Sequence, residues 1–143
     1  MKHYKFSVKL QRKYGNKSLR QGNQVISAND RMYHRVQATI SQFLRDTARE
    51  TAGAITVPFS EERPCECRVV IHPPTKRRMD PPNFNPTVKP LIDGLVDAGI
   101  LTDDNSKVIR RHIFESGDVS GDQNSYRFDI ILQELQHEVE EEI

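Results

Sequence analysis

A stretch with helical periodicity lies between two strand-like stretches in the middle of the chain, and this order limits the possible folds. Between residues 87 and 98, apolar side chains recur at the spacing of one helix face, at Val88, Leu91, Ile92, Leu95 and Val96. Gly99 supplies a stop, and Pro90 predicts that the helix begins near Thr87 and not much earlier. The segments ECRVVIH (66–72) and KVIRRHIF (107–114) are rich in β-branched residues and predict strands on either side.

The remaining patterns complete an α+β domain. Residues 4–10 alternate as a half-buried strand does, and SYRFDIILQEL (125–135) predicts a last strand. A second helix of about 20 residues is expected from Ser27, with Ser27 or Asn29 as N-cap and Gly53 as the stop. Its apolar stripe is Val36, Ile40, Phe43, Leu44 and Thr47. The order predicts two helices packed on one mixed or antiparallel sheet of about four strands, with ESGDVSGDQN (115–124) joining the last two as a hairpin.

Size and composition indicate one globular domain over residues 1–143. We expect a mobile basic loop at 11–26 and an acidic tail from about residue 134. No apolar run approaches the roughly 20 residues of a membrane span, and the first residues do not resemble a signal peptide, so a cytoplasmic protein without membrane contact is expected. Cys65 and Cys67 are interpreted as reduced thiols on one strand face, with metal binding as the alternative.

The net charge of +1 hides a division along the chain. Residues 1–78 hold 16 basic and 6 acidic side chains, whereas residues 79–143 hold 5 basic and 14 acidic ones. A basic half that binds a polyanion, joined to an acidic half that binds cations, suits a metal-dependent enzyme acting on nucleic acid. The alternative is an ordinary surface in which the two halves neutralise each other.

Basic side chains gather in three segments of the first half. On the predicted second helix, Arg31, Arg35, Gln42, Arg45 and Arg49 fall on the face away from the apolar stripe. Such a face either is merely solvated or contacts phosphates. The candidate DNA-binding residues are Lys13, Lys17, Arg31, Arg35, Lys76, Arg77 and Arg78.

Aspartates gather around the central helix. Asp80 precedes it, and Asp103 and Asp104 follow it at the start of the next strand. The chain leaves the predicted sheet after Asp80, runs along the helix and returns to the sheet at Asp103 and Asp104, so these carboxylates can lie at neighbouring strand ends. Since Mg²⁺ usually takes only one or two protein carboxylates, this arrangement predicts a site for the ion. Each residue also has a simpler explanation, because Asp80 suits a turn and Asp103-Asp104-Asn105 suits a cap.

The same helix carries Lys89, Asp93 and Asp97 on one polar face, at i, i+4 and i+8. Lys89 and Asp93 can form a surface ion pair worth a few tenths of a kcal/mol. If the face looks toward the other aspartates, Lys89 can instead stabilise charge on a phosphoryl group in the transition state.

Three motifs in this region resemble the RusA family of Holliday junction resolvases, which is common in prophages. They are R-R-x-D-x-x-N (77–83), K-x-x-x-D-x-L-x-x-A-G (89–99) and T-D-D-N (102–105). The segment NDRMYHRV (29–36) is also similar to phage-type members, so that the likeness covers about residues 27–52 and 66–131.

The resemblance implies a Mg²⁺-dependent homodimeric endodeoxyribonuclease, with Mn²⁺ as a substitute ion, that resolves four-way DNA junctions in recombination and repair. It implies Asp80 and Asp104 as catalytic metal ligands, Asp103 as a supporting ligand, and Lys89 as the catalytic residue that serves the transition state. This chain departs from the family at Pro82, where a second aspartate is often found, and has three extra residues before Lys89. Asp93 or Asp103 can replace the lost ligand.

Three functions remain open on the sequence alone. The first is a junction endonuclease, the second a junction-binding protein with an impaired site, and the third a phosphohydrolase for small phosphate esters. His34, His72 and His112 are expected to have packing or surface roles.

Overall fold

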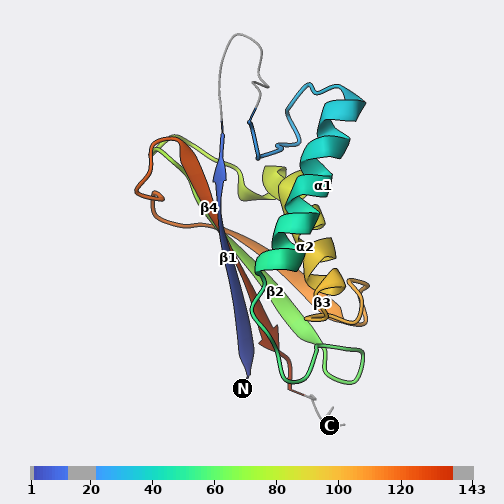
Figure 1. The fold of residues 1–143 in the computed structure, drawn as a ribbon. Helices are drawn as coiled ribbons and strands as arrows, with labels where there is room; N and C mark the ends of the chain where they lie inside the picture. The colour runs from blue at the N-terminus through green and yellow to red at the C-terminus, as the bar shows by residue number, and fades with distance from the viewer. Residues whose placement is uncertain (1, 13–21, 137–143) are drawn as a thin grey trace.

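The computed structural model describes residues 2–12 and 22–136 and has the predicted α+β architecture (Figure 1). Its elements in chain order are β1 (His3–Gln11), α1 (His34–Thr51), β2 (Cys65–His72), the 3₁₀ helix η1 (Pro81–Phe84), α2 (Asn85–Asp97), β3 (Ile109–Ser116) and β4 (Ser125–Glu134). The two α-helices lie side by side on one face of a single four-stranded sheet (Figure 1). Within the described part of the chain, no helix has the length and apolar composition needed to cross a bilayer.

The strand order is β1-β4-β2-β3, which contradicts the hairpin predicted between the last two strands. β2 lies between them, pairing parallel with β3 and antiparallel with β4. The parallel pair arises because α2 carries the chain from the end of β2 back to the start of β3, as a parallel connection requires. The Gly/Asp loop after β3 therefore passes the end of β2 before β4 begins.

α2 follows the predicted apolar stripe but starts earlier than expected. Val88, Leu91, Ile92 and Leu95 are buried, whereas Val96 is only partly buried. The helix begins at Asn85 because Pro86 lies in its first turn, where a missing amide hydrogen costs nothing. At the other end Gly99 has a φ of +80°, the left-handed conformation that the predicted stop requires.

α1 begins at His34, seven residues later than predicted, so Arg31 lies outside the helix and off its polar face. Asp30 accounts for the delay, because its carboxylate accepts a hydrogen bond from the Ser27 amide at 2.8 Å and pairs with the buried Arg12 at 2.6 Å. These bonds hold residues 27–30 as a turn. The buried face of the helix is Ile40, Leu44 and Ala48, while Val36 and Phe43 of the predicted stripe are exposed.

The prediction of a mobile loop over residues 11–26 is wrong for the part that the structure describes. Gln11 belongs to β1, and Val25 and Ile26 are buried in the core. Ile26 exchanges two hydrogen bonds with the hydroxyl group of Thr87, at 2.8 and 2.7 Å, which fastens this segment to α2. Lys13 and Lys17, like the end of the acidic tail, lie outside the described residues.

The two cysteines are buried under the helices, at alternate positions of β2 as predicted. Burial raises the pKa of both thiols to about 12. At neutral pH both are therefore in the neutral thiol form.

Candidate functional site

Lys89 joins two aspartates on the outer side of α2. Its ammonium group donates a hydrogen bond to Asp93, one helical turn later, at 2.8 Å, and a second to Asp104 in the turn before β3. All three side chains retain access to solvent, with Lys89 55%, Asp93 29% and Asp104 27% exposed. The predicted ion pair within the helix is therefore part of a larger cluster, which we call the Lys89 cluster (Lys89, Asp93 and Asp104).

The turn that presents Asp104 is shaped by its neighbours. Asp103 accepts a hydrogen bond from the Asp104 amide at 2.7 Å and another from the Asn105 side chain at 3.1 Å. Asn105 in turn accepts one from the Lys107 amide at 2.9 Å. Both carboxylate oxygens of Asp103, which was predicted to be a supporting metal ligand, thus stabilise the turn.

The charges of the Lys89 cluster stabilise one another. The hydrogen bond from Lys89 lowers the pKa of Asp104, although partial burial opposes the shift. For Lys89, partial burial acts to lower the pKa, but the hydrogen bonds to Asp104 and Asp93 outweigh it and the pKa is raised. Lys89 and Asp104 consequently hold each other in their charged forms.

His112 borders this cluster, a position that no sequence pattern predicted. It pairs in register with Cys67, which puts it on the helix side of β3. Burial lowers the pKa of His112, with Asp104 acting to raise it and Lys89 to lower it. The position of His112 follows from the pairing of β2 with β3, whose register shifts between Cys65 and Glu66, and the sequence pattern of one strand does not reveal that register.

Asp80 occupies a different position. It is exposed, directly precedes η1, and its backbone carbonyl accepts a hydrogen bond from the Asn83 amide at 3.0 Å. Its carboxylate makes no hydrogen bond or ion pair among the described residues. The same residues contain no group of three or more His, Cys, Asp or Glu side chains that could hold a metal ion. The structure thus brings Lys89 and Asp104 together with Asp93 and does not join Asp80 to them.

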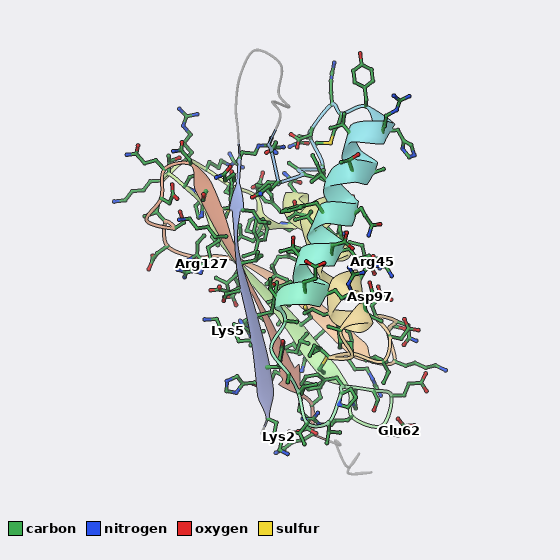
Figure 2. All side chains as sticks on the ribbon, viewed as in Figure 1. Lys2, Lys5, Arg45, Glu62, Asp97 and Arg127 are labelled. Carbon is green, nitrogen blue, oxygen red and sulfur yellow. The ribbon has the colours of Figure 1, made fainter. Side chains whose placement is uncertain are left out.

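The candidate DNA-binding residues differ from most other cations in lacking acidic partners. Within residues 2–12 and 22–136, no ion pair involves the side chains of Arg31, Arg35, Lys76, Arg77 or Arg78. Lys107 and Arg110, at the start of β3, are also unpaired there, and no sequence pattern singled them out. By contrast, Arg45 binds Asp97 through two hydrogen bonds, at 2.6 and 2.9 Å, and the two side chains point toward one another in Figure 2.

On the sheet face opposite the helices, the positive charges are paired with carboxylates. Lys5 and Arg127 both pair with Asp129, and they lie on the far side of the sheet from α2 in Figure 2. Lys9 pairs with Asp122 at 2.7 Å. Arg68 and Arg111 pair with Glu66, and Arg68 also with Glu115. This face therefore offers little free positive charge to a polyanion.

Five cations that make no ion pair among the described residues lie at one end of the molecule, whereas Lys107 and Arg110 lie away from it, at the start of β3. β2 and β3 are parallel and end together at His72 and Ser116, and the Ala28 amide donates to the Asn83 carbonyl at 2.7 Å, which brings the approach to α1 to this end. We call it the basic end (residues 26–35, 73–84 and 116–124), and it is the upper end in Figure 1. Arg31, Arg35, Lys76, Arg77 and Arg78 all belong to it.

Comparison with known proteins adds no assignment. The chain matches no protein-family model and no curated protein sequence. The functional interpretation therefore depends on the site residues and on the resemblance of the sequence motifs.

Proposed function

We propose that the protein is a Mg²⁺-dependent endodeoxyribonuclease that cuts branched DNA, with four-way junctions as its substrate. The observation that carries the proposal is the Lys89 cluster, in which one ammonium group is held between two carboxylates that a helix and a turn bring together. Carboxylates supply the oxygen ligands that Mg²⁺ prefers, and a lysine beside them suits a phosphodiester substrate.

Each residue of the site has a separate role in this proposal. Asp104 and Asp93 fit the donor set of a Mg²⁺ ion, which takes one or two protein carboxylates and completes its shell with water and phosphate oxygens. The ion, when bound, lowers the pKa of a water molecule and stabilises charge on the leaving oxygen. Lys89 neutralises charge on the phosphoryl group, and Asp103 holds the turn that orients Asp104. Asp80, exposed beside η1, is proposed as a further ligand in the DNA complex.

DNA binding is assigned to the basic end and to Lys107 and Arg110. Unpaired cations release counterions when they contact phosphates, whereas a cation already paired with a carboxylate must first lose that partner. Arg31 and Arg35 on one side, and residues 76–78 on the other, frame the approach to η1 and the first turn of α2.

A homodimer is part of the proposal because a four-way junction has two-fold symmetry. Two copies of one chain related by a two-fold axis present two identical sites to such a substrate and allow paired incisions.

A second candidate is a junction-binding protein that does not cut. Pro82 lies in η1, where the family motif often has an aspartate, and a proline side chain has no oxygen to offer a metal. The unpartnered Asp80 favours the same interpretation. This protein would recognise branched DNA through the basic end and would release it as salt is raised.

One experiment separates the candidates. The purified chain is incubated with a labelled four-way junction and the matching linear duplex, with Mg²⁺, Mn²⁺ or a chelator. The nuclease proposal expects paired incisions in the junction that need a metal and disappear in Asp104→Asn but not in Asp46→Asn, a control at a surface aspartate of α1. Junction binding without incision by the wild-type chain favours the second candidate. A folded chain that neither binds nor cuts the junction refutes both.

A further inference from the structure

A cavity of about 540 Å³ opens at the basic end, where the parallel strands β2 and β3 finish. Pro73, Lys76, Arg77 and Met79, from the segment after β2, form one wall, and residues 116–119, after β3, form the other. In open sheets with parallel strands, ligands bind beyond the carboxyl ends of the strands, where the connecting loops diverge. The volume is in the range of small-molecule sites, about 300 to 1,000 Å³.

The two walls are fixed to each other by backbone hydrogen bonds. The Gly117 amide donates to the Ile71 carbonyl, and the Ser120 amide to the Pro73 carbonyl, both at 2.8 Å. The cavity is thus formed before any ligand arrives, which lowers the entropy that binding has to overcome.

His72 supports the second wall from beneath. Its Nδ1 contacts the carbonyl oxygen of Asp118 at 2.8 Å, and its Nε2 contacts the buried carboxylate of Asp129 at 3.0 Å. Gly117 packs so closely on this ring that an added Cβ would lie 2.4 Å from Cε1 of His72. Because Gly117 has no side chain, residues 116–119 can pack directly on the imidazole ring of His72, and this contact holds the loop after β3 in place.

The lining has two chemical halves. Lys76 and Arg77 make no ion pair among the described residues and supply two positive charges, which one carboxylate of the lining, that of Asp118, partly offsets; Pro73, Met79 and Val119 supply apolar surface. Val119 is 40% exposed and is open to a ligand in the cavity. A ligand that suits this lining carries an anionic group, which contacts Lys76 and Arg77, attached to a flat, weakly polar ring, which contacts the apolar side chains.

We propose that this cavity binds one nucleotide unit of a DNA strand, with its phosphate at Lys76 and Arg77 and its base against Pro73, Met79 and Val119. The proposal rests on the proposed function and deepens it, because the unit bound is an unpaired nucleotide displaced at a branch point. Arg78, the next residue along the chain, makes no ion pair among the described residues, and we assign it to the next phosphate of the strand. A base that leaves the stack loses a few kcal/mol of stacking, and contact with the cavity offsets this loss more readily where the strand is already unpaired.

Titration of the ¹⁵N-labelled chain with thymidine 5′-monophosphate, thymidine and inorganic phosphate tests the proposal directly. The nucleotide is expected to shift the amide signals of residues 76–77 and 116–119 together and saturably, and to bind about tenfold more tightly than either fragment, because it uses both halves of the lining. Saturable shifts from the nucleotide at the Lys89 cluster alone, or none at residues 116–119, would overturn it.

Two variants of matched chemistry strengthen the test. Val119→Glu places a carboxylate in the cavity and is expected to weaken nucleotide binding by about tenfold through repulsion of the phosphate. Val57→Glu makes the same change at an exposed valine near the opposite end, two residues before Phe59, which pairs with Leu101, and is expected to leave binding within about twofold. Equal effects of the two variants would mean that only overall charge matters, against a cavity site.

Failure of this inference and failure of the proposed function give different results. A chain that cuts or binds four-way junctions while the nucleotide leaves residues 116–119 unmoved keeps its proposed function and loses the cavity site. A chain that binds the nucleotide in the cavity but neither binds nor cuts branched DNA keeps the site as one for free nucleotides and loses the proposed function.

Discussion

The ammonium group of Lys89 reaches the carboxylate of Asp104 across fifteen residues of chain, from the second turn of α2 to the turn before β3. The same ammonium group holds Asp93, so one cation organises two carboxylates at the solvent boundary. The two carboxylates fix the position of the ammonium group, and a positioned charge is a condition for electrostatic stabilisation of a transition state.

Removal of this cation is expected to abolish most cleavage without unfolding the chain. Lys89→Met keeps the aliphatic length of the side chain but loses the charge, and the cleavage rate for four-way junctions should fall by about 100-fold to 1,000-fold. Junction affinity, measured by gel shift without metal, should change little because one cation is a small part of the basic surface. Unchanged cleavage by Lys89→Met would remove Lys89 from the chemistry.

The ion pair also predicts how stability depends on pH. Because the folded pKa of Asp104 lies below its unfolded value of about 3.9, the pair contributes its full stability above that value and loses it as pH falls through the folded pKa. The difference in free energy of unfolding between the wild type and Asp104→Asn should therefore be constant near pH 6 and shrink below about pH 4. Urea titrations of both chains from pH 3 to pH 7 measure it, and a difference that grows toward low pH would contradict the assignment.

How much of this arrangement the sequence could predict depends on how local each contact is. The i, i+4 pair of Lys89 and Asp93 and the buried stripe of α2 follow from helical spacing alone. The start of α1 does not, because the Arg12–Asp30 pair that delays it joins residues eighteen positions apart. Likewise, β4 pairs with β2 because the crossover through α2 places β3 on one edge of β2 and leaves the other edge for β4.

The candidate site divides in the same way. The aspartates and Lys89 carry recognisable spacing, but the sequence left open whether the helix face with Lys89 looks toward the aspartates beyond the helix; the hydrogen bond from Lys89 to Asp104 shows that it does. The position of His112 depends on strand register, and the turn-forming role of Asp103 depends on backbone amides that no side-chain pattern reveals. The separate position of Asp80 depends on η1, which a proline-rich segment does not distinguish from a simple turn.

The contact between the two helices predicts a sharp difference between two glycines. Gly94 lies so close to α1 that an added Cβ would be 2.3 Å from the carbonyl oxygen of Arg45, so Gly94→Ala should lower the free energy of unfolding by about 1 to 3 kcal/mol through overpacking. Gly53→Ala is the control, because its Cβ would meet only the Tyr4 hydroxyl at 3.9 Å. Its effect should stay within about 0.5 kcal/mol in the same denaturant titration. Comparable losses in both would show that the helices separate easily.

The unpaired cations predict the salt dependence of DNA binding. Arg31→Ala combined with Arg35→Ala should weaken junction binding and reduce the slope of log affinity against log salt by about 2, because each substitution removes one cation that binds a phosphate. Lys9→Ala combined with Arg49→Ala also removes two exposed cations, but both are paired with carboxylates and the slope should change by less than about 1. Fluorescence anisotropy with a labelled junction at several salt concentrations gives the slopes. Equal changes in the two double variants would mean that binding responds to net charge and not to the basic end.

Pro82 gives the last prediction, because it bears on whether the natural chain is fully active. Pro82→Asp adds a carboxylate in η1, two residues after Asp80, and under the second candidate function it should create junction cleavage where the wild type has none. If the wild type already cuts, the Lys89 cluster supplies enough ligands and the variant should change the rate by less than about tenfold. The matched control is Pro82→Asn, which relieves the same backbone restriction but adds no negative charge. A gain in both variants would trace the effect to the backbone of η1, and a gain in Pro82→Asp alone would trace it to the new carboxylate.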